Sequence, residues 1–126
     1  MLVLDSGGFG RLAGRSKQAL ALIEEFRRAG MWPPVVPTMV LVESLQGHPG
    51  RDANANRFLK TVLQDDVVSL EVARRAAELR RRASRGSAVD ALVVSLAEPN
   101  GTVLTGDEAD ISALAAVSNG VGVELV

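Results

Sequence analysis

Short apolar runs alternate along this chain with longer stretches that have helical spacing. The apolar runs predict five short strands, at residues 2–4, 35–36, 67–68, 102–105 and 121–125. Between them, apolar residues recur at i, i+3, i+4 and i+7, which is the spacing of a helix that buries one face. These patterns predict helices at about 16–30, 38–46, 52–63, 69–83, 87–98 and 107–117.

The alternation of strand and helix predicts an α/β fold with a central parallel sheet of about five strands, flanked by helices on both faces. Ser16, Ser69 and Ser87 stand where helix N-caps are expected. The first strand is followed by Ser-Gly-Gly, which predicts a tight loop. There is no hairpin signal, internal repeat or linker, so residues 1–126 are expected to form a single domain.

Composition narrows the function classes. With 47% hydrophobic and 23% charged residues, the 126-residue chain can build one real core. A formal net charge of −1 argues against a protein that coats nucleic acid nonspecifically, although a local basic patch is compatible with it. The absence of cysteine excludes disulfides, zinc–thiolate sites and cysteine nucleophiles.

Nothing in the sequence predicts a membrane protein. Asp5 comes too early for the apolar stretch of a signal peptide, and no apolar run approaches the roughly 20 residues needed to span a bilayer. We therefore expect a cytoplasmic protein without a membrane partner.

The candidate chemistry lies in four acids, Asp5, Glu43, Asp90 and Asp107, each of which interrupts or ends an apolar run. Carboxylates are rarely buried unless something pairs with them. No lysine or arginine adjoins these runs, which favours a divalent cation as the shared partner. Oxygen ligands without cysteine or a nearby histidine suit Mg²⁺ or Mn²⁺, ions that commonly hold phosphate substrates.

Local explanations compete with the metal-site interpretation. Asp5 could hydrogen-bond the backbone of the loop that it begins, and Asp107 could cap the last helix with Asp110 completing the turn. Asp90 fits a capping box with Ser87. Glu43 has the weakest local explanation, because its apolar neighbours on both sides predict a buried helix with no solvated face.

The expected topology brings two of the acids together. Asp5 follows the first strand and Asp107 follows the strand at 102–105, so both lie at the carboxyl edge of the sheet. Ligand sites in open α/β sheets form at this edge. Glu43 is expected to reach the same edge from its helix.

Arginines crowd the helix and loop that lead to Asp90. Most are expected to point outward, either as an ordinary solvated face or as a rim that grips phosphates. They are Arg74, Arg75, Arg80, Arg81, Arg82 and Arg85. His48 is interpreted as a loop residue, and Trp32 as a core or interface residue.

The order Asp5 in LVLDSGG, Glu43 in VESLQG, Asp90 in VDALVV and Asp107 in LTGDEADISAL resembles a PIN domain. The chain is most similar to the VapC-type toxins of type II toxin–antitoxin pairs, over essentially its whole length. The resemblance implies a ribonuclease that binds one or two Mg²⁺ or Mn²⁺ ions and cleaves RNA phosphodiesters with metal-activated water. It also implies a homodimer held by a cognate antitoxin, often through an antitoxin arginine that enters the acidic site.

Carried over to this chain, the resemblance assigns Asp5, Glu43, Asp90 and Asp107 to the acidic quartet that binds metal and performs catalysis. Asp110 matches a frequent additional acid that could replace or assist Asp107. Ser6 and Thr105 would orient these acids or a metal water, and the RNA-gripping rim would contain Arg81, Arg82 and Arg85. One departure is Gly7, where such proteins often carry Ser or Asn. This departure supports an alternative, an inactive PIN-like module that binds RNA or a protein partner.

Overall fold

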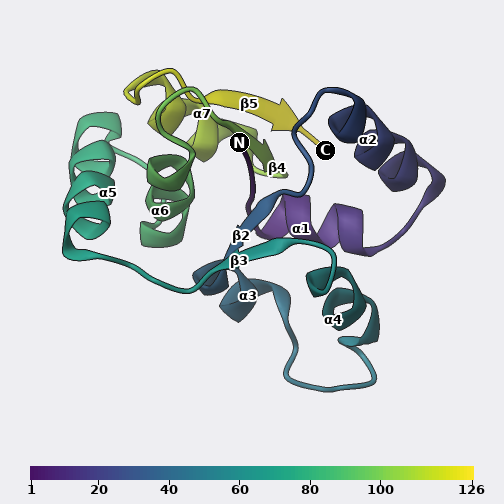
Figure 1. The fold of residues 1–126 in the computed structure, drawn as a ribbon. Helices are drawn as coiled ribbons and strands as arrows, with labels where there is room; N and C mark the ends of the chain where they lie inside the picture. The colour runs from purple at the N-terminus through teal and green to yellow at the C-terminus, as the bar shows by residue number, and fades with distance from the viewer.

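The computed structural model describes all residues 1–126 and contains one sheet of five parallel strands (Figure 1). The strands are β1 (Leu2–Leu4), β2 (Val35–Pro37), β3 (Leu63–Asp65), β4 (Thr102–Thr105) and β5 (Gly122–Leu125). Their order across the sheet is β3-β2-β1-β4-β5. The chain therefore builds outward from β1 in one direction, then returns to add β4 and β5 on its other side. The predicted α/β fold with a five-stranded parallel sheet is confirmed.

Seven helices complete the fold: α1 (Ser6–Ala13), α2 (Lys17–Arg28), α3 (Thr38–Ser44), α4 (Ala53–Leu59), α5 (Leu70–Ala83), α6 (Ala88–Ala97) and α7 (Glu108–Ala116). Helices α1 and α6 both pack against β1 and β4. Helix α1 also contacts α2, α3 and α4, whereas α6 contacts α5 and α7. Figure 1 shows these two groups on either side of the sheet. None of the seven helices has the length and apolar character to cross a membrane.

The core forms where the two helix groups meet the central strands. All three residues of β1 are fully buried, and β1 is paired with β2 at Val3–Val35 and with β4 at Val3–Val103. Helix α6 buries most of its surface, as its apolar sequence predicts. A strand buried on both faces needs a continuous apolar run, which explains the sequence Leu-Val-Leu.

Two predicted elements are wrong around residues 59–68. Helix α4 ends at Leu59, and β3 occupies residues 63–65, where it pairs with β2. Val67 and Val68 lie in no strand, and both are exposed. The apolar pair predicts a short strand, but it belongs to a surface segment that leads into α5.

The predicted loop after β1 is also wrong, because α1 begins directly at Ser6. Gly7 and Gly8, the first two of its three glycines, serve close packing rather than a turn. A Cβ on Gly8 would lie 2.3 Å from the backbone oxygen of Leu104, and a Cβ on Gly7 would lie 2.6 Å from the backbone nitrogen of Gly106. Only residues without a side chain let α1 approach β4 and the turn after it this closely.

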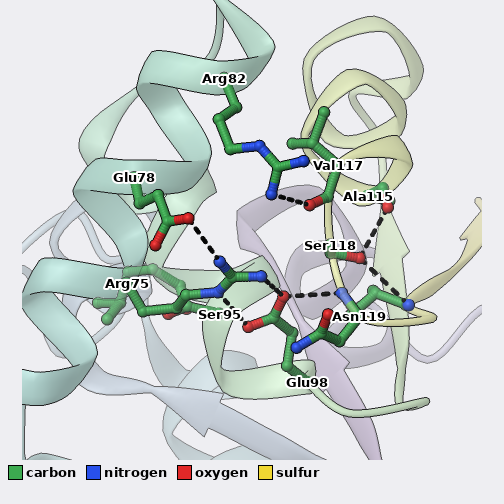
Figure 2. Close-up of polar contacts among 11 residues, drawn as sticks. Arg75, Glu78, Arg82, Ser95, Glu98, Ala115, Val117, Ser118 and Asn119 are labelled. Atoms are coloured by element: carbon green, nitrogen blue, oxygen red, sulfur yellow. Dashed lines mark hydrogen bonds and ion pairs between the residues drawn. The ribbon is translucent and has the colours of Figure 1, made fainter.

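A polar network ties α5 to the far ends of α6 and α7 (Figure 2). The Arg75 guanidinium donates two hydrogen bonds to Glu98, from Nε at 2.8 Å and from Nη2 at 2.7 Å. The backbone N–H of Asn119 donates to the same carboxylate at 2.8 Å. Arg75 therefore points inward, as the exception to the expectation that most of these arginines face solvent. The others are exposed: Arg74, Arg80, Arg81, Arg82 and Arg85.

Candidate metal centre

Asp5 lies at the carboxyl end of β1 and caps α1. Its Oδ1 accepts a hydrogen bond from the Gly8 N–H at 2.8 Å, and its Oδ2 accepts one from the Thr105 hydroxyl. The residue is only 5% exposed. The backbone hydrogen bond considered for Asp5 is therefore present, but it caps a helix instead of beginning a loop, and it fixes the orientation of the carboxylate.

Burial raises the pKa of the Asp5 carboxyl above its usual range. Hydrogen bonds from Gly8 and Thr105 offset part of this effect, and the negative charge of Asp90 adds to it. The influence of Asp90 shows that the two acids share one electrostatic environment. A cation in that environment would favour the charged form of Asp5.

Asp90 is held in the first turn of α6 by a reciprocal capping box. The Ser87 hydroxyl accepts from the Asp90 N–H at 3.0 Å, and Asp90 Oδ2 accepts from the Ser87 N–H at 3.0 Å. The second carboxylate oxygen makes no hydrogen bond within the protein. The cap therefore aims the side chain while leaving one oxygen for another ligand.

Asp107 caps α7 and is linked to Asp5 through Thr105. Asp107 Oδ1 accepts from the Asp110 N–H at 3.2 Å. The Thr105 hydroxyl accepts from the Asp107 N–H at 2.8 Å while it donates to Asp5. One buried threonine thus positions acids from two separate helix N-termini. Ser6, proposed for a similar role, makes no side-chain hydrogen bond.

Three carboxylates converge at the start of α6 and α7. Asp90, Asp107 and Asp110 each offer an oxygen, and these oxygens lie within 4.8 Å of one another. Opposite ligands of an octahedral Mg²⁺ are roughly 4.2 Å apart, given bonds of about 2.0–2.1 Å. The donor set consists only of oxygen atoms, and its spacing is close to what a small hard cation with bound waters requires. These residues fit Mg²⁺ or Mn²⁺.

Glu43 differs from the sequence expectation. The residue is exposed, and Val42 beside it is 77% exposed, because α3 is a short surface helix that buries Val40 but leaves Met39 and Val42 open. The prediction that Glu43 lacks a solvated face is wrong. It does not belong to the converging group of three, so its place in the acidic quartet stays a prediction.

Burial of the acids as a class was also overestimated. Of the four acids singled out by sequence, only Asp5 is buried, and the second buried acid of the protein is Asp52. The Asp52 carboxylate accepts hydrogen bonds from the N–H groups of Gln46, Gly47 and His48, and these lower its pKa. Asp52 is therefore satisfied by its own loop and has a structural role that the sequence did not indicate.

The three arginines of the predicted RNA-gripping rim, Arg81, Arg82 and Arg85, have different partners. Arg85 Nε donates to Asp110 Oδ1 at 2.7 Å, so an arginine does contact the acidic group. Arg82 donates to the carbonyl of Val117 at 3.4 Å, and Arg81 is exposed without a side-chain partner. The sequence missed the contact of Arg85 because the two residues are 25 positions apart.

Comparison with known proteins supports the fold. No protein-family model matches this chain, and no curated protein matches its sequence. Its structure is similar to a chain in the crystal structure of VapBC2 from Rickettsia felis bound to a DNA fragment from their promoter. The TM-score is 0.71 at 14% identity, with 99% of this chain and 98% of that chain covered. The protein therefore has a PIN-like α/β fold over its whole described length.

Proposed function

We propose that residues 1–126 form one ribonuclease domain that hydrolyses RNA phosphodiester bonds with Mg²⁺ or Mn²⁺, as the toxin of a toxin–antitoxin pair. The observation that carries the proposal is the convergence of Asp90, Asp107 and Asp110 next to the buried Asp5. This group lies where the chain reverses its direction across the sheet, between β1 and β4. Such switch points are the usual ligand sites of open α/β folds. The similarity in fold to a chain of a VapBC2 complex supports the same reading.

In this mechanism the protein supplies a rigid acidic frame. Asp5 and Asp107 are oriented by Thr105, and Asp90 is oriented by its capping box with Ser87. A bound divalent cation would supply charge stabilisation at the phosphate and would activate the attacking water. Because each aspartate is already fixed by a helix N-terminus, little reorganisation is needed when the cation and the RNA bind. Glu43 is proposed to contribute the fourth acid of the quartet.

Cleavage of RNA by the purified protein tests the proposal. We expect cleavage with Mg²⁺ or Mn²⁺, none with chelator, and a loss of roughly a hundredfold or more in Asp5→Asn and Asp90→Asn. Asparagine keeps a side-chain oxygen that can accept the N-cap hydrogen bond of Asp5 and the capping-box hydrogen bond of Asp90, so these variants remove charge without removing the cap. Asp66→Asn is the matched control, because Asp66 is exposed and its side chain makes no hydrogen bond or salt bridge. Equal cleavage by the control and the two site variants would contradict the proposal. RNA binding that persists in chelator without cleavage would support the inactive module.

The proposal includes a protein partner, either a second copy of the chain or a cognate antitoxin. It is supported by an apolar groove of about 250 Å³ between α3, α5 and α6. The groove is lined mostly by small and aliphatic side chains: Met39, Val68, Ala73, Ala76, Ala77, Ala88, Val89 and Leu92. Val67 and Leu70, next to this groove in sequence, are both 67% exposed. Exposed apolar surface of this kind is typical of interaction sites.

Light scattering on the purified chain tests whether two copies associate through this groove. If the groove joins two copies, the unmodified chain should have twice the monomer mass, and Leu70→Glu should have the monomer mass. Leu20→Glu is the matched control, since Leu20 is an exposed leucine on α2, a helix that does not line the groove. A monomer whose mass neither substitution changes would contradict self-association through this surface.

A further inference from the structure

The loop between α5 and α6, residues 84–87, is tied to both of its flanking helices. Ser84 ends α5 in the left-handed conformation, with φ of 57°. The Arg80 side chain of α5 donates to the Gly86 carbonyl at 3.2 Å. Ser87 caps α6 and exchanges hydrogen bonds with Asp90. The loop that carries Arg85 is therefore held to α5 by Arg80 and to α6 by the same Ser87 capping box that positions Asp90.

The loop also packs directly on α7. Gly86 has φ of +95°, and a Cβ at this position would lie 2.7 Å from Leu114 Cδ1. Leu114 is fully buried, so it cannot move away freely. Glycine at residue 86 brings the loop against α7 and sets Arg85 beside Asp110, at the start of that helix.

The resulting ion pair introduces the one positive charge that contacts the acidic group. Arg85 Nε lies 2.7 Å from Asp110 Oδ1, and none of the other salt bridges in the structure involves Asp5, Asp90, Asp107 or Asp110. The side chains of Arg85 and Asp110 are 54% and 30% exposed. A pair this exposed is weak and can exchange its partner.

We infer that Arg85 is the resident counter-cation of the Asp90–Asp107–Asp110 group and that it lowers the affinity of this group for a divalent cation. This inference rests on the proposed metal site and adds a positioning residue that tunes it. In the metal-free protein, Arg85 neutralises part of the repulsion between the converging carboxylates. When a divalent cation binds, the same guanidinium repels it and competes with it for Asp110.

Mn²⁺ titration of the whole chain by calorimetry tests the inference. Arg85→Gln is expected to bind Mn²⁺ about three- to tenfold more tightly than the unmodified chain, the effect of removing one charge several ångströms away in a partly solvated site. Arg81→Gln is the matched control, since it removes an equal charge from an exposed side chain without a partner, and should change affinity less than about twofold. Arg85→Lys, which retains the charge, should stay close to the unmodified chain.

Thermal unfolding gives a second readout that a purely structural role of Arg85 would not produce. In chelator, Arg85→Gln should melt at a lower temperature than the unmodified chain, because the carboxylates lose their counter-cation. On addition of Mn²⁺, its melting temperature should rise by more than that of the unmodified chain. Unchanged or weaker Mn²⁺ affinity in Arg85→Gln would overturn the inference.

The outcomes separate this inference from the proposed function. If the unmodified chain binds Mn²⁺ and Arg85→Gln binds it no more tightly, the counter-cation role fails and the metal site stands. If Arg85→Gln binds more tightly but no form of the protein cleaves RNA, the ribonuclease proposal fails and the role of Arg85 stands. If no form binds Mn²⁺, both are overturned.

Discussion

Two arginine–carboxylate pairs connect α5 and the loop after it to the rest of the protein. They differ in burial and in the number of hydrogen bonds that join the two side chains. Arg75 binds Glu98 through two nitrogens, and their side chains are only 24% and 9% exposed. Arg85 contacts Asp110 through one nitrogen, and both of its partners are considerably more open to solvent. The first pair joins helices at the side of the molecule, whereas the second lies at the candidate metal centre.

The difference shows that an arginine–carboxylate pair can either stabilise the fold or leave its carboxylate free to exchange one partner for another. The hydrogen bonds from Arg75 lower the pKa of Glu98, and Glu98 raises the pKa of Arg75. Asn119 occupies a further acceptor site of the same carboxylate, which leaves little room for another ligand. Asp110 carries no such set of partners beyond Arg85. Burial and complete hydrogen bonding make the first pair permanent, and partial exposure makes the second replaceable.

The largest expected effect comes from breaking the buried pair. Glu98→Ala should reduce the free energy of unfolding by about 2 kcal/mol, less than for a fully buried pair because Arg75 retains some contact with water. Glu78→Ala is the matched control. Glu78 also contacts Arg75, at 3.3 Å, but is half exposed, so its loss should cost less than about 0.5 kcal/mol. Urea unfolding measures both, and equal losses would contradict the distinction between buried and exposed partners.

The next largest effect is expected at the close backbone contact beside the candidate metal centre. It tests whether this contact contributes to stability as the buried pair does. Gly7→Ala would place a Cβ 2.6 Å from the Gly106 nitrogen, which must shift the turn that leads to Asp107. We expect a loss of about 1–2 kcal/mol in unfolding free energy and weaker Mn²⁺ binding.

Gly10→Ala, in the same helix, provides the control for Gly7→Ala. A Cβ at Gly10 meets nothing within 4 Å, so this substitution should stabilise the protein by up to about 1 kcal/mol. Urea unfolding of both variants should therefore give effects of opposite sign. Equal behaviour would show that the close approach of α1 to the turn after β4 does not constrain the site.

Lowering the pH should weaken the buried pair selectively. The pKa of Glu98 is lowered in the folded protein relative to its ordinary value of 4.5. The stabilisation is therefore complete above that value and is lost as the pH falls through the lowered pKa. Glu98→Gln removes this titration. The difference in unfolding free energy between the unmodified chain and this variant should shrink by on the order of 1 kcal/mol between neutral pH and about pH 3. A difference that stays constant would contradict the prediction.

The smallest effect concerns the exposed pair and its response to salt. In chelator, Arg85→Gln should cost about 0.5 kcal/mol at low ionic strength, and this cost should approach zero at about 1 M salt. The cost of Glu98→Ala should change much less over the same range, because a buried pair is screened weakly. Urea unfolding at the two salt concentrations measures both. A salt-independent effect of Arg85→Gln would contradict the view that this pair is replaceable.

Sequence patterns predicted the sheet well wherever apolar runs are buried on both sides. The strand at 2–4 and the strand at 102–105 were found because a central parallel strand buries both faces and therefore carries a run of apolar residues, Leu2–Leu4 in the first and Val103–Leu104 in the second. The same rule failed at Val67 and Val68, since an apolar pair on the surface has the same local signature as a short strand. It failed at Glu43 for the same reason, because Met39 and Val42 are apolar but exposed.

The candidate site could be predicted only as far as the topology determines it. Asp5 and Asp107 follow adjacent strands, so their meeting at one edge follows from the strand order. Asp90 was recognisable from the capping box that begins α6. The pairing of Arg85 with Asp110 depends on how α5, α6 and α7 pack, which no local pattern encodes. The close approach that requires Gly7 is likewise visible only in three dimensions.

The hydrogen bond between Thr105 and Asp5 joins residues that are 100 positions apart in the chain. During translation, Asp5 is synthesised early, whereas Asp107 and Asp110 are synthesised late. A nascent or truncated chain that stops before α7 holds Asp5 and Asp90 but lacks the remaining carboxylates of the site. The group of acids described here therefore cannot be completed before α7 has been translated and packed against the earlier part of the fold.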